Sequence, residues 1–488
     1  MTRDYLSGSS PPPGQAPQAG AATNGVACVA FSTESPHGSR GDSPLTDLAR
    51  LLRRSGFPSR VFHVHLHPSD GKENDRRVQR LVERLIGERC RWAVFHEIWT
   101  AELGRQLHAA GIGLIEMRSH TFPEAIFSDG PDLLTHVSAC GTGQSLDELT
   151  NLVEIIGPLE TRPVTAVDLR LQQSCGYTRS LADNPFYQGI LDDPEMAAHK
   201  GCAHCMNARP DQRLVPVQVA ERIVERIRND RRVFPHLETI WMPFAETFYD
   251  SLAIALRTTH GDPVWRDLTL VMQCRPDVIA QRAEEIEAVA ADAAASGTQL
   301  KIGVVGFENF SPPEILVLNR GATPDELDRA AVILNRWSAQ PPPGLVVRGF
   351  TPSFILFTPW TRIEDLEVNL HRIARHGLWQ ANIERLRVGP GTPAYERARR
   401  DGLVLDGSVR AASHPNGYTS EREIRFADPL VAAVSAGFER LRPLAHSEQP
   451  ELLAGVLAAV AAAPDPAGID WDGVARAWED VGSAARTL

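Results

Sequence analysis

The stretch KIGVVGFE, residues 301–308, is a run of apolar and β-branched residues that ends in a carboxylate. Such a run is typical of a buried strand in a parallel sheet. The pattern recurs, with helical periodicity between the runs, in TAVDLRLQQ, ETIWMPF, LTLVMQC, LVVRGFTPSFILFTP and IERLRVGP (residues 165–173, 238–244, 268–274, 345–359 and 383–390). Six strands alternating with helices over about 230 residues predict an α/β fold of the TIM-like type, a partial (β/α)6 barrel.

Polar residues follow these runs, where a barrel of this type gathers its functional groups. The chemistry of such barrels lies at the carboxyl ends of the strands. The residues in these positions are Gln172, Gln173, Glu246, Gln273, Arg275, Glu308, Asn309, Thr358 and Arg387. We therefore expect the functional site at this end of the barrel.

A second α/β pattern precedes the barrel. The runs that predict buried strands are VACVAF, SRVFHVHL, WAVFHEI and IGLIEM (residues 26–31, 59–66, 92–98 and 112–117), and SPLTDLARLLRRSGF (43–57) predicts an amphipathic helix. The segment VSACGTGQSLDELTNLVEII (137–156) predicts a strand, a glycine turn and a helix. Such a turn can present N–H groups to a phosphate or ribose, although a ligand-free turn explains the glycines equally well. These runs predict a Rossmann-like parallel sheet.

Composition sets the expected domain boundaries. We expect a disordered tail rich in Pro, Gly and Ser at 1–23, the first α/β domain at 24–160, the partial barrel at 161–400 and a helical C-terminal cap at 401–488. The longest apolar run, at 452–463, falls short of the roughly 20 residues that cross a bilayer. A net charge of −11 disfavours nucleic acid. These features predict a soluble, cytoplasmic protein.

The seven cysteines are odd in number and mostly scattered, which argues for a reducing compartment rather than a disulfide framework. Cys202 and Cys205 form a CxxC pair, and 26 residues separate Cys202 from Cys175, which follows the first barrel strand. Three thiolates suit a four-iron cluster with one iron open to a ligand, whereas four would make an electron carrier or a structural site. The other cysteines are expected to be small core residues: Cys28, Cys90, Cys140 and Cys274.

Two other interpretations of the cysteine cluster stay open. A structural zinc site would use the three cysteines with His199 or His204 as fourth ligand, although the chain contains no second CxxC. A redox-active CxxC would form a disulfide, although it lies outside a thioredoxin-like βαβ unit.

The motifs and their order resemble the radical S-adenosylmethionine enzymes, specifically the subgroup with an N-terminal cobalamin-binding domain, from about Gly25 to Gly402. Cys175, Cys202 and Cys205 match the cluster cysteines. The strand motifs that match are PFAETF with Glu246, QCRPDVI with Arg275, IGVVGFENFSPPEILVLNRGATPDEL with Glu308 and Asn319-Arg320, FILFTPWTRIEDL, and LRVGPGTPAYERARRDG with Arg387. The turn ACGTGQSLDEL, with Gly141, Gly143 and Ser145, resembles the turn that lies near the corrin tail.

The chain departs from the family pattern at two places. The usual spacing is CxxxCxxC, and here the first gap holds the 26-residue segment GYTRSLADNPFYQGILDDPEMAAHKG. A loop can absorb such an insert at little entropic cost. The cobalt-ligating pattern D-x-H-x-x-G is also absent, HVHLHPSDG at 63–71 being the nearest segment. Members of the subgroup commonly lack that pattern.

The resemblance implies a [4Fe-4S] cluster and S-adenosylmethionine as cofactors, and it leaves cobalamin open. It implies that Glu246 holds the methionine amino group. Arg275, Glu308 and Arg387 would bind the methionine carboxylate, the ribose or the substrate, or else form structural ion pairs. The product would be a 5′-deoxyadenosyl radical, used with cobalamin for C-methylation of a peptide or natural product and without it for epimerisation, cyclisation or carbon–carbon bond formation.

The partners implied are a small-molecule or peptide substrate and a reductant protein of the flavodoxin or ferredoxin type, with neither nucleic acid nor membrane. The alternative function is a non-catalytic binding or regulatory protein on the same fold, stabilised by zinc or by an inert cluster.

Overall fold

A computed structural model describes most of the chain beyond the N-terminal tail. The described residues are 25–33, 39–41, 49, 52, 58–66, 71–95, 103, 106–107, 109–117, 125–126, 153–156, 164–169, 177, 179–204, 216–242, 249–386, 388–389, 391–409, 422–445 and 448–485. They fall into two compact units: unit 1 is Met1–Gln172 with Arg222–Trp241, and unit 2 is Gln173–Glu221 with Met242–Leu488.

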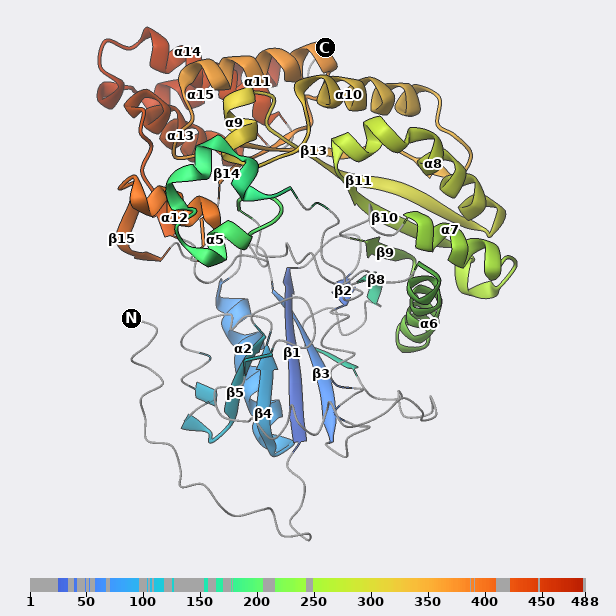
Figure 1. The fold of residues 1–488 in the computed structure, drawn as a ribbon. Helices are drawn as coiled ribbons and strands as arrows, with labels where there is room; N and C mark the ends of the chain where they lie inside the picture. Colours follow the sequence, from blue (N-terminus) through green and yellow to red (C-terminus); the bar gives the residue numbers. More distant parts are fainter. Residues whose placement is uncertain are drawn as a thin grey trace. The chain divides into compact units, whose positions relative to one another are not determined.

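Unit 1 contains the parallel sheet predicted for the N-terminal part (Figure 1). Its strands are β1 (Gly25–Thr33), β3 (Ser59–Leu66), β4 (Cys90–Phe95), β5 (Gly113–Met117), β6 (Ala125–Ile126) and β7 (Val153–Ile156). They lie in the order β6-β5-β4-β1-β3-β7, and every pair is parallel except β5 with β6. Helix α2 (Gly71–Gly87) packs Leu81 and Leu85 into the core of this sheet beside Phe62 and Phe95.

One predicted helix of unit 1 is wrong at its carboxyl end. The pattern of 137–156 predicted a helix running to Ile156, but Val153–Ile156 is strand β7, parallel to β3 with Val153 opposite Val61. Three of the four residues are β-branched, which restricts their side chains in a helix and favours a pleated strand. A four-residue strand is too short to reveal its period in sequence. Of the helix predicted at 43–57, the structure describes Ala49 and Leu52, both helical and fully buried.

All six predicted barrel strands occur in a second, curled sheet, and wherever the register of its strand pairs is defined the strands are parallel. Its strands are β2 (Ser39–Gly41), β8 (Val164–Asp168), β9 (Thr239–Met242), β10 (Leu268–Cys274), β11 (Thr298–Glu308), β12 (Leu345–Val346), β13 (Thr351–Phe357) and β14 (Asn382–Arg385). Their order is β14-β13-β11-β10-β9-β8-β2, with β12 paired to β11. Strand β2, which pairs with β8, has no signal in the sequence pattern. The chain is therefore a mixed α/β protein with a parallel half-barrel sheet.

Helices alternate with these strands, and α8, α10 and α11 lie along the outer side of β10, β11 and β13 (Figure 1). The helices are α6 (Pro216–Val233), α7 (Tyr249–Thr258), α8 (Pro276–Ala295), α9 (Pro312–Val317), α10 (Pro324–Ala339), α11 (Ile363–His376) and α12 (Pro393–Arg400). Helix α10 shows why such a segment becomes helical. Thr323 and Glu326 form a capping box at its start. Its buried residues recur at helical spacing: Leu327, Ala330, Ala331, Leu334 and Trp337.

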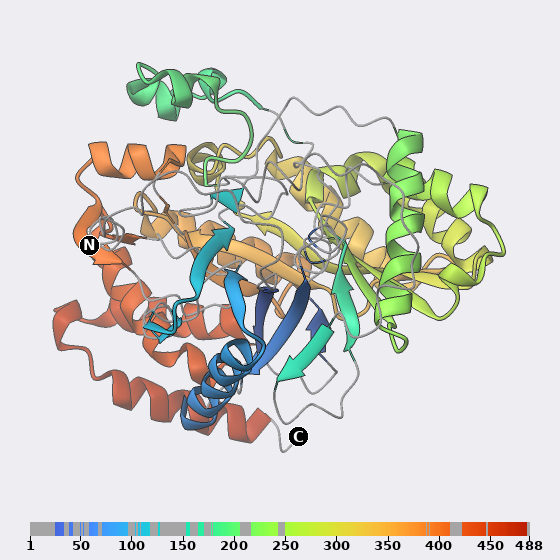
Figure 2. The ribbon, with the colours of Figure 1, turned by 90° about the horizontal axis from the view of Figure 1, so that it is seen from below.

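The C-terminal region is mainly helical, as predicted, with α13 (Pro429–Leu441), α14 (Gln449–Ala462) and α15 (Trp471–Ala485), coloured orange to red in Figure 2. An antiparallel pair that the sequence did not predict, β15 (Val404–Val409) with β16 (Arg422–Ile424), precedes these helices. Gly437 of α13 lets Trp471 of α15 approach closely, because a Cβ at Gly437 would lie 2.2 Å from the indole. Among the helices of the described residues, none combines the length and apolar character that crossing a membrane requires.

Candidate functional site

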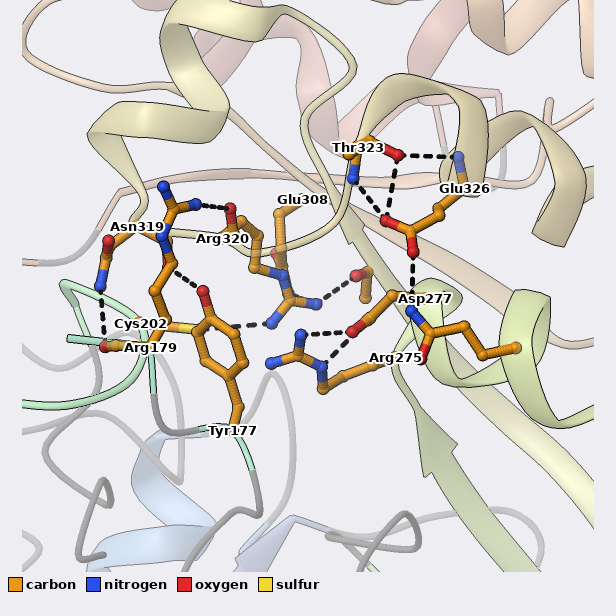
Figure 3. A network of polar contacts seen from close by, with 12 residues as sticks. Tyr177, Arg179, Cys202, Arg275, Asp277, Glu308, Asn319, Arg320, Thr323 and Glu326 are labelled. Carbon is orange, nitrogen blue, oxygen red and sulfur yellow. Dashed lines mark hydrogen bonds and ion pairs between the residues drawn. The ribbon is translucent and has the colours of Figure 1, made fainter. Parts of the chain in front are cut away.

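The structure describes Cys202, Arg275 and Glu308 among the residues predicted for the site. The other predicted residues lie outside the described ones and remain predictions: Cys175, Cys205, Glu246, Arg387, Gly141, Gly143 and Ser145. The three described residues belong to unit 2, and they are brought together (Figure 3).

Arg275 and Glu308 stand at the carboxyl ends of neighbouring parallel strands, β10 and β11. Arg275 is the residue before α8, and its Nε and Nη2 donate to the two carboxylate oxygens of Asp277, at 3.0 and 2.6 Å. Glu308 has a φ of 62°, in the left-handed region that non-glycine residues rarely adopt. Backbone in that region carries a cost that the surrounding structure must offset.

Arg320 connects Glu308 to the cysteine sulfur. Its Nη1 donates to Cys202 Sγ at 3.4 Å, and its Nη2 donates to the Gly306 carbonyl at 2.5 Å and lies 3.5 Å from Glu308 Oε1. A side chain at Gly306 would obstruct this arrangement, since a Cβ there would lie 2.5 Å from Glu308 Oε1. The glycine between two buried strand residues therefore has a steric reason.

Tyr177 lies in the segment that precedes Cys202 and contacts Arg275 and the backbone beside Arg320. The Arg275 guanidinium lies 3.9 Å from the centre of the Tyr177 ring, a cation–π contact, and the Tyr177 hydroxyl donates to the Asn319 carbonyl at 2.7 Å. Burial raises the pKa of Tyr177 to about 12, and the charge of Cys202 acts in the same direction. Tyr177 is therefore a neutral hydroxyl donor at pH 7.

Two buried guanidinium donors of this network are unpaired. Arg275 is 6 % and Arg320 is 7 % exposed, and within the described part of the chain neither Arg275 Nη1 nor Arg320 Nε has a hydrogen-bond partner. Burial opposes the charge of both arginines, but for Arg320 the neighbouring Cys202 and Glu308 outweigh it and raise its pKa. Buried cationic donors without a partner favour an anionic ligand, because an unpaired buried donor costs desolvation energy.

Burial raises the pKa of Glu308, against the attraction of Arg320 and Arg275. The Glu308 side chain is 14 % exposed, so it can contact a ligand. It can accept a hydrogen bond from a hydroxyl or ammonium group when ionised and donate one when protonated.

The two histidines considered as zinc ligands flank Cys202. His199 Nε2 lies 3.1 Å from the carbonyl oxygen of Cys202, and burial lowers the pKa of His199. Burial, followed by the charges of Arg320 and His199, lowers the pKa of His204 to about 4, so this imidazole is neutral at pH 7. Within the ranges that the structure describes, no group of three His, Cys, Asp or Glu side chains is arranged to hold a metal ion.

Sequence reasoning missed part of this network. Tyr177 was not singled out, and Asp277 and Arg320 were noted only as parts of motifs. Arg320 and Cys202 are 118 residues apart, and Tyr177 and Asn319 are 142 apart, so no local pattern links them. The three core predictions that the structure can test, at Cys28, Cys90 and Cys274, are correct, at 0 %, 9 % and 4 % exposure; Cys140 lies outside the described residues.

The fold is similar to that of a cobalamin-dependent S-adenosylmethionine radical enzyme, OxsB. The structure of OxsB with aqua-cobalamin and S-adenosylmethionine bound matches with a TM-score of 0.51 and 11% identity, over 88% of this chain and 70% of that chain. The apo, selenomethionine-labelled OxsB structure matches with a TM-score of 0.50 and 12% identity, over 90% and 71%. No protein-family profile and no curated protein matches. At this identity the likeness is one of fold.

Proposed function

We propose that the chain is a radical S-adenosylmethionine enzyme that holds a [4Fe-4S] cluster on Cys175, Cys202 and Cys205. One observation carries the proposal: Cys202 Sγ accepts a hydrogen bond from Arg320 beside Arg275 and Glu308, at the carboxyl ends of parallel strands. The fold that contains this arrangement is similar to that of an enzyme with this chemistry.

The residues around Cys202 fit an iron–sulfur cluster. Cys202 is 7 % exposed, and a buried guanidinium donates to its sulfur. Hydrogen bonds to cluster sulfurs and low solvent exposure are the means by which proteins set cluster potentials. A cluster held by Cys175, Cys202 and Cys205 would supply the electron for reductive cleavage of bound S-adenosylmethionine to the 5′-deoxyadenosyl radical.

The charged residues take separate roles in this proposal. Arg275 Nη1 and Arg320 Nε, both unpaired among the described residues, would donate to the methionine carboxylate. Glu308 would accept hydrogen bonds from the ribose hydroxyls. Glu246 would hold the methionine amino group, and Arg387 would complete the binding of cofactor or substrate.

We further propose that the parallel sheet of unit 1 binds cobalamin, with Gly141, Gly143 and Ser145 near the corrin tail. The reaction would then be methyl transfer to an unreactive carbon of a peptide or natural product, with a flavodoxin or ferredoxin as electron donor. Without cobalamin, the same radical would serve another C–H functionalisation.

The test is anaerobic reconstitution with iron and sulfide, followed by reduction with S-adenosylmethionine and chromatography of 5′-deoxyadenosine. We expect 5′-deoxyadenosine from the parent protein and from Cys28→Ala, because Cys28 lies in the core of unit 1. Cys202→Ala should load no intact cluster and form none.

Retained iron and an unchanged spectrum in Cys202→Ala would contradict the assignment of that cysteine. A colourless protein that binds zinc and loads no cluster would favour the binding or regulatory protein instead.

A further inference from the structure

The insert between Cys175 and Cys202 is ordered over the part that the structure describes. Two 3-10 helices, η3 (Leu181–Asp183) and η4 (Pro185–Ile190), precede α5 (Pro194–Ala198). Its apolar residues join a core cluster with α12 and the loop after α9: Leu181, Tyr187, Ile190, Met196, Ala203, Leu318, Leu386, Val388, Ala394 and Ile424. The insert is therefore packed within unit 2.

The insert and the residues that follow it hydrogen-bond to five consecutive carbonyl groups, those of residues 316–320. The donors and distances are Asn184 Nδ2 to Leu316 (2.7 Å), Tyr187 Oη to Val317 (2.5 Å), Ala203 N to Leu318 (3.0 Å), Tyr177 Oη to Asn319 (2.7 Å) and Arg179 Nη1 to Arg320 (3.2 Å). Carbonyls at the end of a helix such as α9 lack intrahelical partners. Here, residues 177–203 donate to the carbonyls at and just after the end of α9 and fix the path of the loop that carries Arg320.

Asn319 stands at the centre of these contacts and is 0 % exposed. Its Oδ1 accepts from Asn184 Nδ2 at 3.0 Å, and its Nδ2 donates to the carbonyls of Gly201 at 2.6 Å and Arg179 at 3.4 Å. Its φ of 48° lies in the left-handed region, which asparagine tolerates better than most residues. One side chain therefore links both ends of the insert.

The hydrogen bond from Asn319 to Gly201 lies one residue away from both members of the sulfur contact. Asn319 precedes Arg320, and Gly201 precedes Cys202. Arg320 Nη1 reaches Cys202 Sγ at 3.4 Å (Figure 3). Joining the two backbones at 319 and 201 restricts the distance between the guanidinium and the sulfur.

We propose that the insert is a brace that holds Arg320 on the Cys202 sulfur, and that Asn319 is its central positioning residue. This inference rests on the proposed function, because the contact it protects would adjust the reduction potential of the bound cluster. The brace also explains how a chain with a 26-residue gap keeps its second cysteine in a defined place.

Asn319→Gly tests the brace, because glycine keeps the left-handed backbone and removes the three side-chain hydrogen bonds. Asp267→Gly is the matched control, since Asp267 is an exposed residue with a φ of 57° that is not part of the Cys202 network. In the cluster-free protein, we expect Cys202 to be alkylated roughly tenfold faster in Asn319→Gly than in the parent. Fragmentation of the labelled peptide separates Cys202 from Cys205.

A second readout follows the sulfur contact itself. In reconstituted protein, we expect Asn319→Gly to lower the midpoint potential of the cluster and change its reduced-state EPR spectrum, because an N–H donor to sulfur favours the reduced form. Asp267→Gly should match the parent in both. If the substitutions only loosened the fold, the melting temperature would fall in both Asn319→Gly and Asp267→Gly. The midpoint potential of the clusters that remain intact would then stay at the value of the parent protein.

The outcomes separate the brace from the proposed function. Unchanged alkylation of Cys202 in Asn319→Gly would overturn the brace. If the parent loads no cluster but Cys202 is protected in an Asn319-dependent way, the proposed function fails and the brace stands.

Should Asn319→Gly fail to fold, Asn184→Ala decides the question, with Asn335→Ala as control. Each removes an asparagine that donates to a backbone carbonyl, but Asn335 bonds to His376 on the helical layer. Faster alkylation of Cys202 in Asn184→Ala alone supports the brace, and equal rates in the two overturn it.

Discussion

At the scale of single residues, the candidate site is a set of buried charges that balance one another. Arg275 is paired with Asp277, and Arg320 is paired with Glu308, yet each arginine retains one unpaired donor among the described residues. Removing one partner of such a pair leaves the other charge unpaired in a poorly hydrated environment. We therefore expect substitutions here to affect both folding and ligand binding, which makes Cys202→Ala the cleaner test of function.

A buried acid outside the site gives a prediction about pH. Glu314 on α9 is 1 % exposed, accepts a hydrogen bond from Thr358 at 3.2 Å, and has one oxygen without a partner in the described structure. Burial raises the pKa of Glu314 to about 8, and Asp365 adds to the shift while hydrogen bonds from Thr358 and Thr361 oppose it. The folded protein therefore holds this proton at a pH where the unfolded chain has lost it.

The sign follows from the raised pKa. Between the ordinary value of 4.5 and about 8, the folded state binds more protons than the unfolded state, so the free energy of unfolding falls as pH rises. The slope is at most about 1.4 kcal/mol per pH unit. Glu314→Gln should reduce this slope in denaturant titrations from pH 5 to 8, whereas Glu364→Gln, at an exposed position, should not. Parallel pH profiles for the parent and Glu314→Gln would contradict the assignment.

At the scale of elements, the site depends on connections that turn sharply after β11. The strand ends at Glu308 in the left-handed region, α9 follows after three residues, and Asn319 is left-handed again before α10. Each reversal returns the chain toward the carboxyl ends of the strands. Because α9 has only six residues, the functional side chains before and after it lie close together.

The turn before β12 gives a prediction about packing between elements. Gly344 has a φ of 74°, and a Cβ there would lie 2.1 Å from the carbonyl oxygen of Ala290 in α8. Gly402 has a φ of 70° with no atom within 4 Å of the same position. Gly402→Ala should cost about 1 kcal/mol for the backbone alone, and Gly344→Ala should cost about 3 kcal/mol or more, because backbone must move.

Denaturant unfolding of the two variants measures the difference. Equal losses of stability would show that α8 and the turn before β12 are less closely packed than the structure indicates.

At the scale of the whole molecule, the chain combines a parallel sheet in unit 1 with a half-barrel sheet, and its overall fold is similar to that of OxsB. At 11% identity this likeness is one of overall fold, and most side chains differ. The chemistry of this particular chain must therefore be tested on its own residues.

The proposed binding of cobalamin gives a prediction at this scale. The chain lacks the D-x-H-x-x-G pattern, so the bound cobalamin should have no protein histidine on cobalt. Any axial nitrogen splitting in the cob(II)alamin EPR spectrum of the complex should therefore come from the cofactor's own base, and it should persist in His67→Ala. Axial nitrogen splitting that disappears in His67→Ala would contradict this prediction, and equilibrium dialysis measures whether the cofactor binds at all.

The sequence by itself determined β1, β3, β4 and β5 of the first sheet, the six predicted barrel strands, and the burial of Cys28 and Cys274, because apolar runs bounded by turn residues indicate buried segments. It also indicated the strand ends where Arg275 and Glu308 lie. The strand at Val153–Ile156, the pairing of β2 with β8, and the antiparallel pair β15 and β16 were decided by tertiary structure. The conformation of a short segment is decided by the neighbouring elements, which offer it unpaired backbone groups and apolar surface.

The same physical reason explains why one part of the site could be predicted from the sequence and the other could not. Cys202 is conspicuous in sequence because its neighbour Cys205 lies three residues away. Its contact with Arg320, the support of Arg275 by Tyr177, and the link from Asn319 to Gly201 join residues more than 90 positions apart. Only the folded chain decides such contacts, because the half-barrel brings the ends of distant strands together while local sequence governs each strand alone.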